Sequence, residues 1–399
     1  MIRTNIQTAA GIVFILLLWA GPGCILLEAQ PVESHYIQTQ ISPLELSSDS
    51  GFESFSMLNE VVEDYRFFFT AEEHWLAMNA QMRYRFLMYL YYHAEVRNLV
   101  VEGGYSYSYM INMYLETGNE NLLIRAIYDI PVCPKDLIAF YRELYTFNRF
   151  LPSREKIKVV GIDLEQSPQL VIYCMVNMLP DKPLTAGVRE KINQLKVLNE
   201  TDFNDKEMKK YFRQLYKEVQ ERKRAYRRYW GDKYWLFEML LENTVEGFDS
   251  PLLREFVYAH GDEKKREERM YANFRLLYKY HIFQPGNFYG QFGGIHTELN
   301  PSINWGYHTL AQQLNTERYS PMRGKVLTIS KFFRRVPRIY ERFREYEDFM
   351  KLMTEIDHTV PYDVVLCRIW GNDDLFPEIS KDFQYLLIIK DSVESDPCR

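Results

Sequence analysis

The sequence predicts an α/β protein with a mainly parallel central sheet flanked by helices, and with a helical insertion. Two observations support this fold class: short runs of β-branched and aromatic residues recur along the chain, and most are separated by stretches long enough for a helix. Strands separated by helices pair in parallel and are covered on both faces. With 399 residues, 47% of them hydrophobic, the chain can bury a large core.

Seven segments have the composition of strands. They are residues 66–70, 98–102, 158–164, 287–293, 325–333, 363–369 and 383–390. Between the first two, residues 75–94 carry apolar side chains at a helical spacing, among them Met78, Met82 and Phe86. This part of the chain is therefore predicted to form a β-α-β unit.

The remaining segments set the domain organisation. Residues 184–279 show helical periodicity and no credible strand, which predicts a helical insertion between the two parts of an α/β domain, residues 63–183 and 280–392. Residues 31–62 are polar and Ser-rich, and we expect a tether followed by a first helix near residues 57–64. Residues 1–30 are expected to be a signal sequence.

The N-terminus has the pattern of an export signal. Arg3 precedes an apolar run from Ala9 to Ala20, which is short for a membrane span but typical of a signal peptide. We expect a periplasmic or extracellular protein. Cleavage before Cys24 would leave a lipid anchor, cleavage near Ala29 would leave a soluble chain, and an uncleaved membrane anchor is a third alternative.

Charge and cysteine content exclude three classes of protein. The net charge is −6, and Lys and Arg alternate with Asp and Glu along most of the chain, so no basic patch indicates nucleic-acid binding. The cysteines lie far apart without a C-x-x-C pair, which excludes a cysteine zinc site and a disulfide scaffold. Cys174 and Cys367 lie in apolar stretches and are predicted to be small core residues.

Acidic residues and histidines follow four of the predicted strands. They are Glu72 with His74, Glu102, Asp163 and His296. Ligands of an open parallel sheet bind at the carboxyl ends of its strands, so these side chains are expected to share one site. A single acid after a strand is commonly a helix cap, but four strands in succession favour a functional site. Glu102 directly follows an apolar run, where a buried carboxylate needs a partner, a metal or a raised pKa.

A helical segment before the fourth of these strands adds further polar residues. Arg266, Arg269 and Asn273 follow one another at three- and four-residue spacing and are expected to share one helix face, from which they could bind a substrate carboxylate or an oxyanion. Ordinary ion pairs with Glu268 are the alternative.

Five segments, taken in order, resemble the erythromycin-esterase-like superfamily, which also contains the haem-binding ChaN proteins and the TIKI-type proteases. They are AEEH at 71–74, VVEGG at 100–104, VVGIDL at 159–164, REERMYANF at 266–274 and GQFGGIH at 290–296. The resemblance covers residues 64–390. It implies that four positions are catalytic and that three others support them. The catalytic positions are Glu72, His74, Glu102 and His296, and the supporting ones are Asp163, Arg269 and Asn273.

The expected function is hydrolysis of an ester or lactone in a small-molecule substrate. His74 or His296 would act as general base on water, Glu72 or Glu102 would orient the imidazole, and Arg269 would stabilise the oxyanion. No G-x-S-x-G nucleophile elbow is present.

Two alternatives stay open. A divalent metal at His74, Glu102 and His296 would make a TIKI-like, metal-dependent hydrolase. In a ChaN-like protein, the same site, with Tyr105, Tyr107 and Tyr109 nearby, would bind haem or another small ligand without turnover.

Overall fold

The computed structural model describes the larger part of the chain. The described residues are 36, 39–47, 51–74, 76–128, 135–201, 204–250, 260–300, 306–333, 353–358, 360, 362–372, 376 and 379–392. The chain divides into two compact units, residues 1–39 and 40–399, and the elements below belong to the second. The predicted signal sequence, with Arg3 and Cys24, lies outside the described residues. No helix of the described part is both long enough and apolar enough to cross a membrane.

The described residues form one mixed sheet of eight strands in the order β1-β7-β8-β6-β2-β5-β3-β4. Its strands are β1 (Ile41–Pro43), β2 (Phe67–Glu72), β3 (Val96–Val101), β4 (Lys158–Gly161), β5 (Asn287–Gly293), β6 (Val326–Phe333), β7 (Val364–Arg368) and β8 (Tyr385–Ile389). The strands from β8 to β4 pair in parallel, whereas β7 pairs antiparallel with both β8 and β1. All seven predicted strands are therefore confirmed, and the fold class is α/β.

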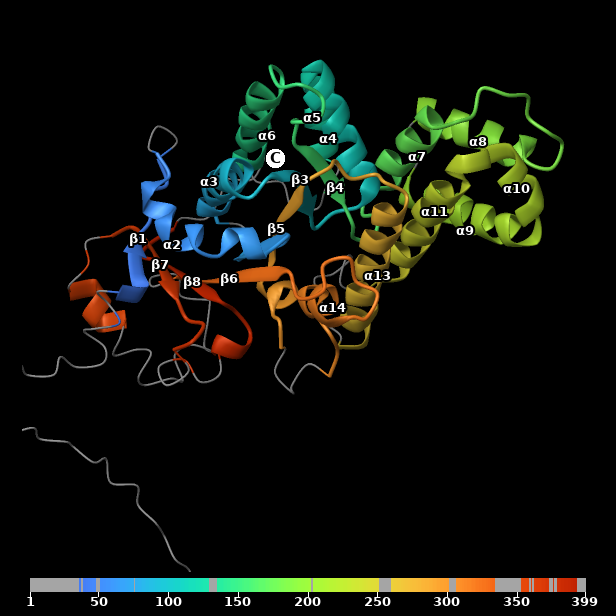
Figure 1. The fold of residues 1–399 in the computed structure, drawn as a ribbon. Coiled ribbons are helices and arrows are strands. Elements are labelled where there is room, and N and C mark those ends of the chain that lie inside the picture. The colour runs from blue at the N-terminus through green and yellow to red at the C-terminus, as the bar shows by residue number, and fades with distance from the viewer. Residues whose placement is uncertain are drawn as a thin grey trace, which may run out of the picture. The chain divides into compact units, whose positions relative to one another are not determined.

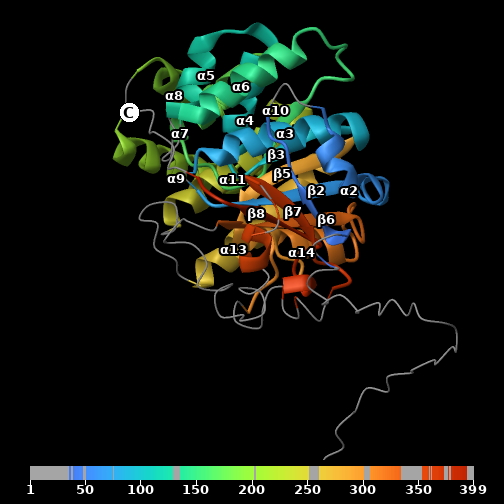
Figure 2. The same ribbon diagram turned by 90° about the vertical axis from the view of Figure 1, so that its left-hand side faces the viewer.

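Helices cover both faces of this sheet (Figures 1 and 2). The α-helices are α2 (Ser56–Asn59), α3 (Met78–His93), α4 (Tyr105–Thr117), α5 (Glu120–Tyr128), α6 (Lys135–Asn148), α7 (Pro168–Asn177), α8 (Arg189–Glu200), α9 (Asp205–Glu221), α10 (Lys223–Trp230), α11 (Tyr234–Asp249), α13 (His260–Lys279) and α14 (Leu310–Thr316). Short 3₁₀ turns are η1 (Glu53–Phe55), η2 (Val62–Asp64), η3 (Gly231–Lys233), η4 (Gly294–Thr297) and η5 (Ile379–Lys381).

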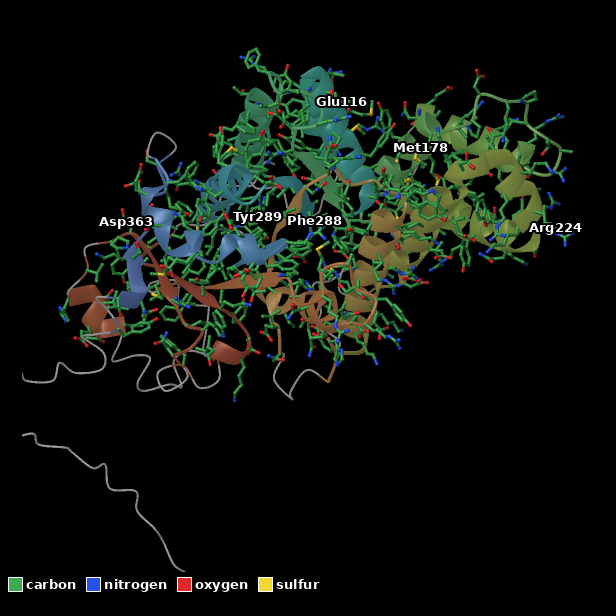
Figure 3. The ribbon with its side chains drawn as sticks, viewed as in Figure 1. Glu116, Met178, Arg224, Phe288, Tyr289 and Asp363 are labelled. Atoms are coloured by element: carbon green, nitrogen blue, oxygen red, sulfur yellow. The ribbon has the colours of Figure 1, made fainter. Side chains whose placement is uncertain are left out.

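Alternation along β2 assigns its side chains to two separate cores. Phe68 packs into the core beneath α3 to α6, whereas Phe67 and Phe69 pack into the core shared with α7 to α14. Neighbouring β5 alternates in the same way, with Tyr289 in the first core and Phe288 in the second. Both of these residues lie in the middle of the molecule in Figure 3. The strands at the centre of the sheet are thus held firmly on both faces.

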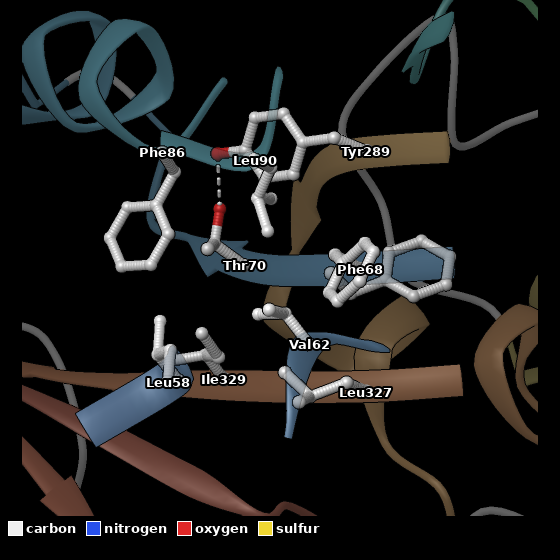
Figure 4. Close-up of a pocket in the computed structure, with 10 residues that line it drawn as sticks. Leu58, Val62, Phe68, Thr70, Phe86, Leu90, Tyr289, Leu327 and Ile329 are labelled. Atoms are coloured by element: carbon white, nitrogen blue, oxygen red, sulfur yellow. Dashed lines mark hydrogen bonds between the residues drawn. The ribbon is translucent and has the colours of Figure 1, made fainter. Parts of the chain in front are cut away.

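A small cavity in the first core is almost entirely apolar (Figure 4). It has space for about one water molecule. Its polar atoms come from Thr70 and Tyr289, whose hydroxyl oxygens lie 2.8 Å apart and satisfy each other. The cavity is a packing defect of the core, and the polar residues predicted for the site do not line it.

The structure differs from the sequence-based prediction in two places. The edge strand β1 lies in the segment predicted to be a tether, because three residues are too few to give an alternating pattern. Near residues 57–64, where one helix was expected, the chain forms the four-residue helix α2 followed by the 3₁₀ turn η2. The described residues of 184–279 form the helices α8 to α11 and α13 with short connections and no strand, and Arg224 on α10 lies far from Tyr289 of the central sheet (Figure 3).

Cys174 and Cys367 are buried and not disulfide-bonded, as expected for small core residues. The predicted helix at residues 75–94 is observed as α3.

Candidate active site

The carboxyl ends of β2, β3, β4 and β5 bring the predicted residues together. Glu102 directly follows β3, and His296 lies in η4, directly after β5. His296 Nε2 is 3.3 Å from Glu102 Oε1, and the Gly293 amide donates to Glu102 Oε2 over 2.9 Å. Since β3 and β5 are adjacent parallel strands, these side chains meet at one edge of the sheet.

Arg266 of α13 joins the ends of β3 and β4. Its Nε donates to both oxygens of Asp163 over 3.1 Å, and its Nη2 donates to Asp163 Oδ2 over 2.5 Å and to Glu102 Oε1 over 2.7 Å. Asp163 is fully buried, so its charge needs this paired partner. The remaining nitrogen, Nη1, lies 3.4 Å from His296 Nε2. One guanidinium thus holds two carboxylates and faces the imidazole.

The end of β2 supplies a second carboxylate–imidazole pair. Glu72 Oε1 lies 2.9 Å from His74 Nδ1, and Arg83 of α3 donates to the other oxygen of Glu72 over 2.8 Å. The side chain of His74 is 45% exposed, whereas those of Glu72 and Arg83 are 12% and 14% exposed. No hydrogen bond to another described residue engages His74 Nε2. This nitrogen is therefore placed to bind water or substrate.

Gly293 lies where the two pairs converge. A Cβ atom built on this glycine would be 3.4 Å from His74 Nε2, 3.5 Å from Glu102 Oε2 and 3.5 Å from His296 Cδ2. One point in space is therefore close to all three side chains. Because glycine has no side chain, this space stays open between them.

Both histidines favour the protonated form. Burial opposes the charge on His74, but the hydrogen bond that its Nδ1 donates to Glu72 and the charge of Glu102 outweigh it and raise the pKa of His74 to about 9. For His296, burial is likewise outweighed by Glu267 and Glu102, which raise its pKa to about 10. Each imidazole is thus stabilised as a cation by the carboxylates around it.

The same contacts lower the pKa values of Glu102 and Glu72. Burial works against ionisation of Glu102, but the charges of His296 and Arg266 hold its pKa well below the usual range. Burial also opposes ionisation of Glu72, and His74 and Arg83 lower its pKa. With both histidines protonated, the cluster balances four acids against four cations. The acids are Glu72, Glu102, Asp163 and Glu267, and the cations are His74, Arg83, Arg266 and His296.

The three residues predicted to share one face of α13 are divided between two environments. Arg266 contacts the site, and Asn273 donates to the Ile162 carbonyl over 2.8 Å, next to Asp163. Arg269 pairs instead with Glu242 and Glu246 of α11. The expected role of Arg269 at an oxyanion is therefore corrected. Three residues turn an α-helix about 60° away from its starting face, whereas seven residues return close to it.

Two residues of the site were not predicted from the sequence. Glu267 contacts His296 Nδ1 and also accepts from the Leu310 amide at the start of α14. Arg83 holds Glu72 from α3. Charged residues are common on helices, so neither position stood out. The one sequence signal for Glu267 was its position next to Arg266. In the structure its side chain is 1% exposed.

Two of the three proposed metal ligands, Glu102 and His296, are held by other partners. Within the described residues, no group of three or more His, Cys, Asp or Glu side chains is arranged to hold a metal ion. Arg266 and His296 occupy Glu102 Oε1, and Glu267 occupies His296 Nδ1. The guanidinium thus supplies the positive charge that a metal would bring, and these residues do not fit a metal site.

Of the three tyrosines proposed to lie near a ligand, the structure places Tyr107 in the core and leaves Tyr105 and Tyr109 partly exposed. Tyr107 is buried, and its hydroxyl bonds to that of Tyr141 over 2.9 Å, inside the core rather than at the site. Tyr105 and Tyr109 are half-buried on α4, and burial raises the pKa of Tyr109 to about 12.

The fold is similar to those of several solved structures, among them an erythromycin esterase. A mutant of the erythromycin esterase EreC, in its open conformation, is similar at 15% identity and a TM-score of 0.60, over 90% of this chain and 98% of that chain. A succinoglycan biosynthesis protein is similar at 15% identity and a TM-score of 0.65, over 92% of this chain and 99% of that one.

ChaN of Campylobacter jejuni, solved with cofacial haem, aligns at 13% identity with a TM-score of 0.35, over 88% of this chain and 98% of that one. No protein-family model and no curated protein matches the sequence. The likeness to the EreC structure confirms, for the fold, the resemblance inferred from the five sequence segments.

Proposed function

We propose that this chain is a hydrolase that cleaves an ester or lactone in a small molecule. The observation that carries the proposal is the convergence of His74 Nε2, Glu102 Oε2 and the His296 ring on the open space beside Gly293. A histidine oriented by a carboxylate, with its second nitrogen turned to an open position, is the arrangement that general-base catalysis needs. The likeness to EreC supports the same reaction class.

In this proposal His74 is the base rather than His296. Both nitrogens of His296 face carboxylates, whereas Nε2 of His74 has no partner among the described residues. Glu72 holds the His74 ring through Nδ1 and stabilises the imidazolium that forms when water is deprotonated. Water activated at Nε2 attacks the carbonyl carbon. The tetrahedral intermediate then breaks its bond to the alcohol oxygen, which takes the proton that His74 removed from water, so no covalent intermediate with the protein is required.

The developing oxyanion would be stabilised from the opposite side of the site. Arg266 Nη1 is the one guanidinium nitrogen that does not bind a carboxylate, and His296 stays protonated beside it. Arg266 Nη1 is the hydrogen-bond donor, and His296, whose two nitrogens both face carboxylates, contributes its positive charge. Asp163 and Glu267 fix both groups before substrate arrives, so little reorganisation is needed. Arg266 thereby takes the role that the sequence suggested for Arg269.

The test is a substrate screen with the purified full chain at pH 9. The probes are 4-nitrophenyl acetate, 4-nitrophenyl butyrate, γ- and δ-lactones and a macrocyclic lactone, each with and without EDTA. We expect hydrolysis that EDTA does not abolish, and a loss of at least about 100-fold in His74→Ala and in Glu72→Gln. The matched control is His308→Ala, because the His308 side chain is 62% exposed and outside the site.

Two outcomes would contradict the proposal. One is the absence of hydrolysis for every probe between pH 7 and 10, and the other is a wild-type rate in His74→Ala. A Soret band on addition of haem, combined with no hydrolysis, would indicate a binding protein instead.

Export is a separate proposal, supported by Arg3 and the apolar run that follows it. The test is N-terminal sequencing of the mature protein from a bacterial host, together with labelling by palmitate. Cleavage before Cys24 predicts labelling that Cys24→Ala removes, whereas cleavage near Ala29 predicts no labelling. Recovery of the uncleaved chain in the cytoplasm would refute export.

A further inference from the structure

A buried lysine lies near the carboxyl end of β6, on the side of the sheet where the strand ends carry the site. Lys331 lies on β6, two residues beyond Ile329, which pairs in register with Thr70 of β2. Glu72 lies the same two residues beyond Thr70, so Lys331 and Glu72 project from neighbouring strands on the same face. Lys331 is 0% exposed. None of the steps in the proposed hydrolysis uses it.

The amine of Lys331 reaches the turn that carries His74 through one intermediate residue. Lys331 Nζ donates to Asn79 Oδ1 over 3.3 Å, and Asn79 Nδ2 donates to the Glu73 carbonyl over 2.5 Å. Asn79 is the second residue of α3 and is 7% exposed. Glu73 is the residue between Glu72 and His74, so this chain of hydrogen bonds ends at the turn that aims the imidazole.

The chemistry of lysine explains why it occupies this position. An amine or ammonium nitrogen donates hydrogen bonds to Asn79 in either protonation state, and it therefore fixes the oxygen of the carboxamide toward β6. The Asn79 NH₂ group must then face the Glu73 carbonyl. An apolar residue at position 331 would leave the Asn79 oxygen buried without a partner, and a flipped amide would direct that oxygen against the Glu73 carbonyl.

The burial of this lysine is costly, which points to a role beyond packing. Burial outweighs the attraction of Glu72 and lowers the pKa of Lys331 to about 7. A side chain needed only to fill the core between β6 and α3 would be apolar. Buried ionisable groups with shifted pKa values are concentrated at functional sites.

We propose that Lys331 is a positioning residue that acts through Asn79 on the Glu72–His74 turn and keeps His74 Nε2 facing Gly293. The link to catalysis rests on the proposed hydrolase function, whereas the effect on His74 can be measured without any substrate. Lys331 itself does not touch the reacting atoms.

The experiment compares four variants of the full chain labelled with ¹⁵N-histidine. They are Lys331→Met, Asn79→Leu, the double variant and the control Ser330→Ala, which alters the adjacent buried residue of β6. Imidazole ¹⁵N resonances report the hydrogen bond between Glu72 and His74, and hydrogen exchange reports the order of residues 72–76. We expect shifted His74 resonances and at least tenfold faster exchange in both single variants, and none of this in Ser330→Ala.

The double variant tests the path. If Lys331 acts through Asn79, removing both side chains changes His74 no more than removing either one, because the two substitutions break the same chain of hydrogen bonds. Effects that add would overturn the proposal, as would wild-type resonances and exchange in Lys331→Met. If Lys331→Met fails to fold, Asn79→Asp keeps the shape of residue 79 and replaces the donor to Glu73 with a carboxylate oxygen, which repels the Glu73 carbonyl, so it is expected to show the same changes.

Kinetics separates positioning from general destabilisation. On any ester or lactone that the wild type hydrolyses, Lys331→Met is expected to lower kcat at least tenfold while KM stays within twofold, because the substrate surface is intact and the base is misdirected. A rise in KM with kcat unchanged would refute this assignment. If the wild type hydrolyses no probe, the hydrolase proposal fails, and the resonance and exchange measurements still decide the role of Lys331.

Discussion

His296 and Glu102, which come from different halves of the chain, lie 3.3 Å apart between Nε2 and Oε1. The contact exists because β5 pairs in parallel with β3, and both side chains follow the carboxyl ends of these strands. Arg266 donates to the same oxygen of Glu102, so the acid is shared by two cations. This shared carboxylate couples the ends of the two strands to α13.

The rate of hydrolysis is predicted to rise with pH up to about pH 9. The pKa of His74 is raised to about 9, so at neutral pH only a small fraction of the imidazole is free to accept a proton. Below about pH 9, kcat/KM should increase close to tenfold for each pH unit. Protonation of His296 persists to about pH 10, and above that value the rate should fall. A profile of kcat/KM from pH 6 to 11 measures both limbs, and a flat profile below pH 9 would argue against His74 as base.

Gly293→Ala should fold normally and lose activity. The backbone at Gly293 has φ −48° and ψ 140°, which alanine adopts without strain, and the added methyl group would meet only ordinary contacts of 3.4 to 3.5 Å. That methyl group would, however, fill the space toward which His74, Glu102 and His296 converge. We expect a loss in kcat/KM of at least about tenfold with an unchanged melting temperature. Full activity would place the reacting carbonyl elsewhere.

Glu267→Gln should impair the site although residue 267 is remote from the open space beside Gly293. Glu267 fixes Nδ1 of His296 and favours its imidazolium form. The amide is neutral, so the pKa of His296 should fall and kcat should drop at least about tenfold. Its neighbour Glu268 is 59% exposed and provides the matched control as Glu268→Gln. NMR titration of His296 and steady-state kinetics measure the two effects, and equal behaviour of the two variants would contradict them.

Glu165→Gln is predicted to stabilise the fold at alkaline pH. Burial raises the pKa of Glu165 to about 7, even though its carboxylate accepts hydrogen bonds from the backbone amide and hydroxyl of Ser106. A raised acid pKa leaves stability intact below the unfolded value of about 4.5 and reduces it as pH rises through about 7. Glutamine removes that loss, so the free energy of unfolding should increase by roughly 3 kcal/mol at pH 8 and not at pH 4.

Urea unfolding at pH 4 and pH 8 checks the Glu165 prediction. The exposed Glu155→Gln variant serves as control, and its free energy of unfolding should match wild type at both values. An equal gain for Glu165→Gln at both pH values would show that the effect does not come from the carboxyl charge.

The site residues that directly follow parallel strands could be predicted from the sequence, because the position of such a strand determines where its next residues lie. Glu72, Glu102, Asp163 and His296 could therefore be assigned to one edge before their contacts were known. Helix positions were harder, since every turn of α13 carries charged residues and only the packing of the helix selects the face that points inward. For this reason Glu267 was missed and Arg269 was assigned to the wrong environment.

Elements with a long, regular pattern were likewise predictable, and short ones were not. The strands β2, β3, β6, β7 and β8 each carry four or more apolar or aromatic residues, whereas β1 has three residues and pairs only at the edge. The hydrogen bond of Lys331 could not be predicted from the sequence either, because a lysine inside an apolar strand gives no indication of which residue accepts its hydrogen bond.

The position of β5 in the sheet has a consequence for the order of assembly. β2 and β3 follow each other in the chain with α3 between them, yet they are not neighbours, because β5 lies between them. A ribosome-bound chain that ends before residue 287 would have two strands with unpaired inner edges, and Glu102 would lack its contacts with Gly293 and His296. We therefore expect such truncated chains to need chaperones and to be inactive, and the complete chain to fold slowly, since its central pairing joins segments far apart in sequence.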